Sequence, residues 1–468
     1  MKSLIPLLAG RQLFDRHLSK EQRKLLPTIP AIQAIPGIST SSTRFGGQRF
    51  TCNRCYTSHP HHFYSFQCKT CQQLCTYCVN CIQMKRISTC GQLYHLPPLP
   101  FQTPSRYFYD WQGQYSDEQQ QAVDELLHAI QHNTPHLIHA VCGSGKTEMM
   151  FAGIHAYLQN HQQVAVASPR TDVILELAPR FQQVFQHIPM QVLYGGSADR
   201  DQPFAHGITL TTTHQLFKFK HAFDAIFVDE ADAFPYHFDK TLQQAVQQAV
   251  KPNAPVHAIT ATPNRQLLQT YASRSVIAIR YHGYLLPTPR FQAIWSYEKK
   301  VAKGQLPPVV ERWIVEKIKA RQPFLLFVYS IAAMEKIEAA LQALHESIRI
   351  VHAASDERKE LVQQLREGKR VGLATTTILE RGVTLKTIQV AVLGADQAIF
   401  TKEALVQIGG RVGRNTEYPA GDFILFHAGR TEAMLACARE MKQLNERAMT
   451  TTTYQKRREA DALYPLSD

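Results

Sequence analysis

The chain has 468 residues, a length that suggests about three domains, and 44% of them are hydrophobic, which is enough for ordinary globular cores. Lysine and arginine number 51 against 38 acidic residues, so the formal net charge is +13. This excess favours a polyanionic partner, nucleic acid first and an acidic membrane surface second, although a soluble basic enzyme would also show it. No apolar run reaches the roughly 18 residues of a transmembrane helix, and the short apolar stretch 4–9 does not predict a signal peptide.

The first 50 residues have only a weak pattern. A charged stretch over 15–26 predicts a helix, and three prolines with a Ser/Thr cluster predict a linker after it. We therefore expect residues 1–50 to form an N-terminal helix and a linker.

Eight of the ten cysteines lie between Cys52 and Cys90. They include three C-x-x-C pairs: Cys52 and Cys55, Cys68 and Cys71, and Cys78 and Cys81. In a chain with no predicted signal peptide, such pairs favour Zn²⁺ sites over disulfides, and redox-active cysteine is the alternative. We expect a zinc-binding module over 51–97. The cysteines suffice for two sites, and the other ligands to consider are Cys75, His59, His61 and His62.

The segment 140–147 reads AVCGSGKT, a Walker A phosphate loop with Ala140 in place of the first glycine. A strand candidate over 136–140 precedes it, and helical periodicity follows from Glu148. Lys146 would reach the β- and γ-phosphates of ATP, and the Thr147 hydroxyl would bind Mg²⁺. The backbone that would cradle the phosphates belongs to Gly143, Ser144 and Gly145.

A helix opens just ahead of the phosphate loop, with Ser116 as its predicted N-cap. An aromatic cluster over 107–115 comes before it. An aromatic residue and a glutamine in this place often read adenine, so Gln119 is a candidate adenine contact. The alternative is that this stretch is a packed domain edge.

After the phosphate loop, strand candidates alternate with helices, which predicts a parallel sheet with ligand loops at the strand ends. These strand candidates are 164–168, 208–214, 225–230 and 256–260. The third ends in Asp229 and Glu230, as a Walker B motif does. Asp229 would hold Mg²⁺, and Glu230 would orient and deprotonate the attacking water.

A second alternating segment begins near Leu306, and its strand candidates are 323–330, 349–352, 371–375 and 390–394. It lacks a phosphate loop but keeps glycine and arginine in the segment 407–414. This combination suggests a partner lobe whose arginines would reach the nucleotide as arginine fingers.

The motifs AVCGSGKT, SPRTD, TTTHQL, VDEAD, TATP, TTILERGVT and QIGGRVGR occur in order over 116–414. This series resembles that of superfamily 2 helicases and translocases. Together with the CNRC and YCVNC segments, it resembles the ComFA family of late-competence DNA-uptake ATPases over roughly 45–450. The resemblance implies an α/β fold with two tandem RecA-like parallel-sheet domains, over 105–284 and 300–455, preceded by the small cysteine-rich zinc module.

The resemblance also implies roles for single residues. Arg411 and Arg414 would stabilise the γ-phosphate, Gly382 would help to bind the nucleotide, and Thr260 and Thr262 would couple hydrolysis to domain movement. The expected contacts to the DNA backbone are Pro169, Arg170, Thr212, Thr213, Thr376 and Thr377. The zinc ligands that match the family are Cys52, Cys55, Cys78 and Cys81. Cys68, Cys71 and Cys75 depart from the family pattern and leave the ligand set open.

The function implied is ATP-dependent translocation of single-stranded DNA during natural transformation, with ATP, Mg²⁺ and Zn²⁺ as cofactors. The expected location is cytoplasmic, peripheral to the inner face of the membrane. The expected partners are the DNA-uptake channel and other late-competence proteins, and a homo-oligomer stays open. The alternatives are a replication-restart DNA helicase, an RNA helicase and, against the intact catalytic motifs, a non-enzymatic zinc adaptor.

Overall fold

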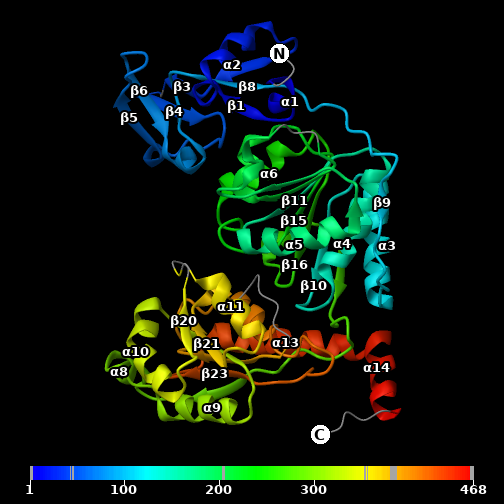
Figure 1. Ribbon diagram of the computed structural model, residues 1–468, viewed down its shortest axis with the longest axis vertical. Helices are drawn as coiled ribbons and strands as arrows, with labels where there is room; N and C mark the ends of the chain where they lie inside the picture. The colour runs from blue at the N-terminus through cyan, green and yellow to red at the C-terminus, as the bar shows by residue number, and fades with distance from the viewer. Residues whose placement is uncertain are drawn as a thin grey trace. The chain divides into compact units, whose positions relative to one another are not determined.

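The computed structural model describes residues 4–42, 44, 47–202, 206–352, 355, 357–379 and 387–463. The chain divides into two compact units (Figure 1). The first comprises Met1–Gly113, Val123–Ile138 and Thr147–Ser275, and the second comprises Gln114–Ala122, His139–Lys146 and Val276–Asp468. None of the helices in the described ranges is both long and apolar enough to span a lipid bilayer.

The N-terminal residues form a small domain built around a three-stranded antiparallel sheet. Strand β8 (Gln92–His95) lies between β1 (Gln12–Phe14) and β2 (Gln33–Pro36). Helices α1 (Leu4–Leu8) and α2 (Lys20–Leu25) accompany it, and a capping box at Ser19 starts α2. The buried core of this N-terminal domain is Leu4, Leu8, Leu18, Leu26, Ile29 and Leu96.

The structure corrects the expectation for residues 1–50. The helix lies inside the expected stretch 15–26, but the stretch after it is no linker. Strands β1 and β2 both pair with β8, which lies far along the chain beyond the cysteines. Sequence periodicity could not show this, because each strand is too short for a pattern and takes its partner from a distant segment.

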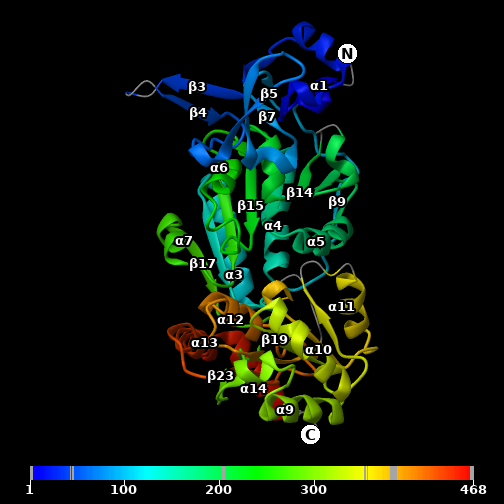
Figure 2. The ribbon, with the colours of Figure 1, turned by 90° about the vertical axis from the view of Figure 1, so that its left-hand side faces the viewer.

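The cysteines lie in a module of short strands inserted between β2 and β8. A hairpin joins β3 (Ile38–Ser42) to β4 (Gln48–Cys52), and a second sheet has the order β5 (Phe63–Gln67), β6 (Leu74–Cys78) and β7 (Ile87–Ser88) (Figure 2). Its inner face is built largely of cysteine, and it carries few large apolar side chains. Such a module depends on something other than a hydrophobic core for its stability.

The first large sheet has seven strands in the order β13, β14, β11, β15, β16, β10 and β17. The pairs from β13 to β16 are parallel. The strands are β10 (His136–Ala140), β11 (Val164–Ser168), β13 (Met190–Leu193), β14 (Ile208–Thr212), β15 (Ala225–Asp229), β16 (Val256–Thr260) and β17 (Ser273–Ile277). The helices are α3 (Asp117–Gln131), α4 (Lys146–Gln159), α5 (Thr171–Val184), α6 (Lys240–Ala249) and α7 (Arg265–Thr270). Every residue of the central strands β11 and β15 is buried, which explains their unbroken apolar sequences.

The second large sheet has six strands in the order β18, β23, β22, β19, β21 and β20, and every neighbouring pair is parallel. The strands are β18 (Arg290–Ala293), β19 (Phe324–Val328), β20 (Arg349–Val351), β21 (Gly372–Thr375), β22 (Gln389–Leu393) and β23 (Phe423–His427). The helices are α8 (Tyr297–Ala302), α9 (Pro308–Lys319), α10 (Ile331–Leu344), α11 (Arg358–Arg366), α12 (Lys402–Gly409), α13 (Glu432–Met449) and α14 (Thr452–Leu463). The two parallel sheets confirm the predicted α/β fold class with two tandem domains.

Candidate functional site

The phosphate loop joins the end of β10 to the start of α4. Gly143 and Gly145 have φ angles of +83° and +76°, in the left-handed region that strains any residue with a side chain. The backbone can therefore curl as a triphosphate cradle requires. The Lys146 Nζ donates to Ala140 O at 3.2 Å and to Val141 O at 3.3 Å, so the ammonium lies over the loop. A phosphate is a charged and therefore stronger acceptor than these carbonyls, so the loop fits ATP.

Gln119 touches the phosphate loop directly. Its Nε2 donates to Ser144 O at 2.8 Å, and its Oε1 accepts from Ser116 N at 2.8 Å. Gln119 N in turn donates to Ser116 Oγ at 3.3 Å, which confirms Ser116 as the N-cap of α3. This buried amide ties the start of α3 to the loop. Its reading of adenine stays a prediction.

The aromatic stretch before α3 forms a packed edge. Strand β9 (Phe108–Tyr109) pairs with β12 (Phe185–Gln186), and the Tyr109 ring stacks on His155 with a centroid distance of 4.2 Å. This arrangement accounts for the cluster by packing alone, as the alternative interpretation proposed.

Oxygen ligands suited to Mg²⁺ stand at two element ends. Asp229 is buried at the end of β15, and its Oδ1 accepts from Glu230 N at 2.9 Å. Glu230 has a left-handed φ of +55°, a strained geometry of the kind that gathers at functional sites. The Thr147 hydroxyl accepts from Arg180 Nη1 at 3.2 Å. Hydroxyl and carboxylate oxygens are what Mg²⁺ prefers, so these residues fit the ion.

A buried network links the VDEAD segment to the TATP segment. The carboxylate of Asp232 accepts from the Thr260 hydroxyl, and its Oδ2 accepts from Thr262 Oγ1 at 2.6 Å. Thr262 N also donates to Thr260 Oγ1 at 3.0 Å. All three side chains are buried. Sequence reasoning proposed the two threonines but missed Asp232, although its place in the VDEAD string was a signal.

The candidate finger arginines follow α12 in the second unit. Arg411 is buried, and Arg414 is half-buried, with its Nε donating to Gly410 O at 2.9 Å. A second buried arginine that sequence reasoning missed, Arg280, donates to Gly413 O at 2.7 Å. Burial and then the positive charge of Arg414 lower the pKa of Arg280 to about 10. Cys142 of the phosphate loop donates to Gln407 Oε1 at 3.1 Å, so within the second unit the loop contacts the segment that carries both candidate fingers.

The expected nucleic-acid contacts have different exposures. Pro169 and Arg170 are half-buried after β11, and Thr212 ends β14. Pro169 and Thr212 line one cavity of about 550 Å³. Thr213 is fully buried, so the structure does not support it as a direct contact. Thr376 and Thr377 are half-buried after β21, while Gly382 lies outside the described residues.

Four buried cysteines, Cys52, Cys55, Cys78 and Cys81, form a first tetrad. Their sulfur atoms all lie within 4.8 Å of one another, with Cys52 to Cys81 at 3.7 Å and Cys55 to Cys78 at 3.6 Å. Four bonds of about 2.3 Å to a tetrahedral zinc ion place sulfur atoms about 3.8 Å apart, so the tetrad fits Zn²⁺. Arg54 Nε donates to Cys81 Sγ at 3.4 Å, which would offset the negative charge of such a centre.

A second tetrad consists of Cys68, Cys71, Cys75 and Cys90. Its sulfur atoms meet the same limit, with Cys68 to Cys90 at 3.7 Å and Cys71 to Cys75 at 3.3 Å. Sequence reasoning kept the first three as further ligands but missed Cys90, which has no C-x-x-C partner. No histidine among the described residues belongs to either tetrad, so the alternative ligands His59, His61 and His62 are not used.

Three family models match the chain in order. Residues 1–95 match the competence protein ComFA N-terminal domain, residues 112–265 match the type III restriction enzyme res subunit, and residues 308–416 match the helicase conserved C-terminal domain. The last two are the ATPase domains of helicases, so the chain is an ATP-hydrolysing enzyme. The solved structure of S. cerevisiae Dbp5 bound to RNA and ADP BeF3 is similar in fold, with a TM-score of 0.54 at 15% identity, covering 71% of this chain and 88% of that one.

Two curated relatives are similar over most of their length. Competence protein ComFA of Bacillus subtilis (strain 168) is 41% identical over 87% of this chain and 88% of its own. Competence protein ComFA of Streptococcus pneumoniae (strain ATCC BAA-255 / R6) is 34% identical over 94% of this chain and 98% of its own. With its ComFA N-terminal domain, its two RecA-like domains and this degree of identity, the chain belongs to the ComFA family of competence proteins.

Proposed function

We propose that this protein is an ATP-driven translocase of single-stranded DNA that draws transforming DNA into the competent cell. The observation that supports this most is the order β14, β11 and β15 in the first large sheet. Thr212, Pro169 and Asp229 come at the carboxyl ends of these neighbouring parallel strands. The metal-binding end of β15 therefore lies only about 10 Å from the expected strand contact at the end of β14, because neighbouring strands are about 4.8 Å apart.

The residues divide the work of hydrolysis. Lys146 binds the phosphates, and Glu230 orients the attacking water and takes its proton. Mg²⁺ at Thr147 and Asp229 would neutralise charge on the phosphates. Arg411 and Arg414 donate to the charge that develops in the transition state. The hydrogen bonds of Asp232 to the TATP threonines pass a change at the nucleotide to the strand contacts.

The same sheet edge explains why the motor needs no sequence preference. The expected contacts Pro169, Arg170 and Thr212 suit the sugar-phosphate backbone, and none of them presents a base-reading amide. Thr376 and Thr377 would contact the strand from the second unit. Gripping and releasing the backbone in step with hydrolysis moves the strand without reading it.

Both cysteine tetrads hold Zn²⁺ in this proposal. The metal has a structural role, because each tetrad supplies four sulfur ligands and leaves no position for water. With so few large apolar side chains in the module, metal binding would supply much of its folding free energy. The protein would act at the cytoplasmic face of the membrane beside the DNA-uptake channel and other late-competence proteins.

An ATPase assay with single-stranded DNA, double-stranded DNA and RNA tests the proposal. We expect single-stranded DNA to give the largest stimulation. Glu230→Gln should bind nucleotide but not hydrolyse it, while Glu311→Gln, an exposed glutamate on α9, should behave as wild type. Larger stimulation by RNA would instead favour the RNA helicase. A replication-restart helicase would be expected to carry its zinc module within the helicase core, whereas the tetrads here precede it.

A further inference from the structure

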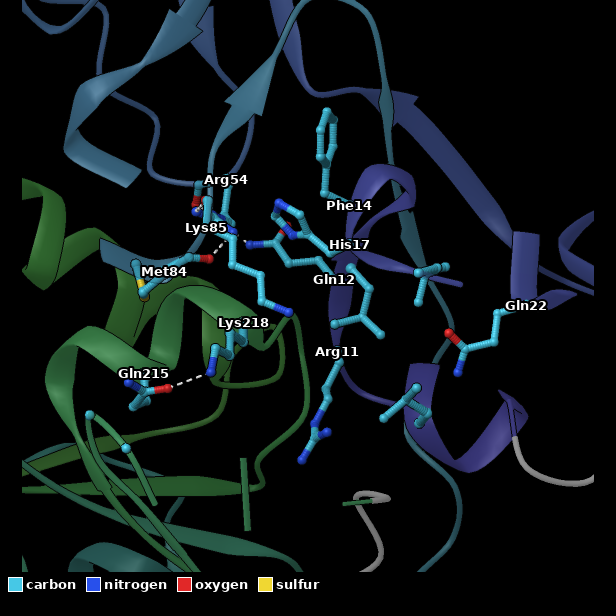
Figure 3. A pocket seen from close by; sticks show the side chains of 15 residues that line it. Arg11, Gln12, Phe14, His17, Gln22, Arg54, Met84, Lys85, Gln215 and Lys218 are labelled. Carbon is cyan, nitrogen blue, oxygen red and sulfur yellow. Dashed lines mark hydrogen bonds between the residues drawn. The ribbon is translucent and has the colours of Figure 1, made fainter. Parts of the chain in front are cut away.

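A cavity of about 340 Å³ lies where the N-terminal domain and the cysteine module meet the first large sheet (Figure 3). Its basic side chains are Arg11, His17, Arg54, Lys85 and Lys218, and this cavity is called the basic pocket below. The labelled residues come from segments that are far apart in the sequence. The family motifs do not include any of these five side chains.

Hydrogen bonds fix the walls of the basic pocket. Gln12 Nε2 donates to Phe217 O at 2.9 Å, and Arg11 Nη2 donates to Gln191 Oε1 at 3.2 Å, so the N-terminal domain is fastened to the first sheet. Arg54 donates to Lys85 O at 2.7 Å and to Cys81 O at 2.9 Å. Because Cys81 belongs to the first tetrad, the metal site also orders this wall. The pocket is therefore a built feature of the fold.

The charge of the basic pocket is one-sided. None of the described residues that line it is acidic, and four of them are lysine or arginine. Figure 3 shows Lys85 and Lys218 reaching toward the same space, with Arg11 below them. Burial and then the charge of Arg54 lower the pKa of His17 to about 4, as expected where positive charge opposes protonation. An anion is the ligand that this environment favours.

The basic pocket continues into the cavity that Pro169 and Thr212 line. Gly195, Gln215 and Met84 line both cavities. A Cβ atom added at Gly195 or Gly196 would meet no atom within 4 Å, so a ligand can approach this backbone closely. A chain that follows the expected strand contacts thus reaches the basic pocket next.

We propose that the basic pocket binds the sugar-phosphate backbone of single-stranded DNA, where the strand passes from the first sheet onto the N-terminal domain. The inference rests on the proposed translocase function and adds a second grip to it. Continuity with Pro169 and Thr212 favours a polymer over a lipid headgroup, because a headgroup needs only one anion site. The cysteine module then has a direct task, since it holds Arg54 and Lys85 against the strand.

Salt-dependent binding of a fluorescent oligothymidylate to the full-length protein tests the inference. The test variants are Lys85→Gln, Lys218→Gln and the double variant, and the matched control is Lys24→Gln, an exposed lysine of α2 that does not line the pocket. Removal of one phosphate-binding lysine should reduce the slope of log K against log salt by about 0.7. We expect a drop of about 1.4 in the double variant by the same relation, and a slope near wild type in the control and in the double Lys→Arg variant.

The outcomes separate this inference from the proposed function. If the wild type binds single-stranded DNA and its ATPase is stimulated, but the double variant keeps the wild-type slope and affinity, only the basic pocket is refuted. If the wild type does not bind single-stranded DNA, the translocase and the pocket fall together. If the double variant loses binding to phosphatidylglycerol vesicles while DNA binding is unchanged, the pocket is a lipid site and the inference is overturned.

Discussion

The side chain of Arg414 is anchored to the end of its own helix by the hydrogen bond to Gly410 O. Such anchoring aims a guanidinium and reduces the entropy lost on engaging a phosphate. We expect Arg414→Ala to lower kcat by about 10³, as loss of an arginine finger does in other phosphoryl-transfer enzymes. Arg430→Ala, which removes an exposed arginine of the same unit, should keep wild-type turnover. Steady-state ATPase kinetics measure both, and full activity of Arg414→Ala would rule out the finger.

The buried carboxylate of Asp232 depends on its two threonine donors. Thr262→Val keeps the shape of the side chain but leaves one carboxylate oxygen without this donor, at a cost of about 1–3 kcal/mol. The melting temperature should therefore fall by several degrees, and single-stranded DNA should stimulate the ATPase less. Thr262→Ser retains the hydroxyl and serves as the control in a thermal melt. A melting temperature equal to wild type in Thr262→Val would show that the bond contributes little.

The second tetrad makes a prediction about metal content at the scale of the small strands. Cys90 follows β7, and the other three ligands flank the turn between β5 and β6. We expect two zinc ions per chain in wild type and one in Cys90→Ser, because the remaining thiolates bind the ion too weakly. Cys437→Ala, outside both tetrads, should keep two. Elemental analysis of reduced protein decides, and one ion in wild type would exclude the second site.

Across the whole molecule, the two parallel sheets and the N-terminal domain together make a motor with two expected grips on its strand. Lys146→Ala should abolish hydrolysis, because the phosphates lose their ammonium donor. In a competent host, labelled DNA should then stay at the cell surface while its internalisation and transformation fall sharply. The measurement requires the variant protein at normal levels. Normal internalisation by such a strain would refute the uptake role and leave the ATPase chemistry standing.

Local sequence was enough for those features whose parts are neighbours in the chain. The phosphate loop is one, because Gly143, Gly145 and Lys146 act through backbone geometry within a single turn. The strands β11 and β15 are others, since a strand covered on both faces must be an unbroken apolar run. The C-x-x-C spacing likewise indicated the first tetrad, because two ligands of one ion are adjacent in sequence.

Tertiary structure alone decided the features whose parts meet from distant segments. Cys90 becomes a ligand only because β7 pairs with β6, and β1 and β2 become strands only by pairing with β8. Asp232 meets Thr262 across the loops that follow neighbouring strands β15 and β16. The basic pocket joins Arg11 to Lys218, which no periodicity links. A pattern in sequence reports which face of an element is buried, but only the packed chain determines which distant side chains meet there.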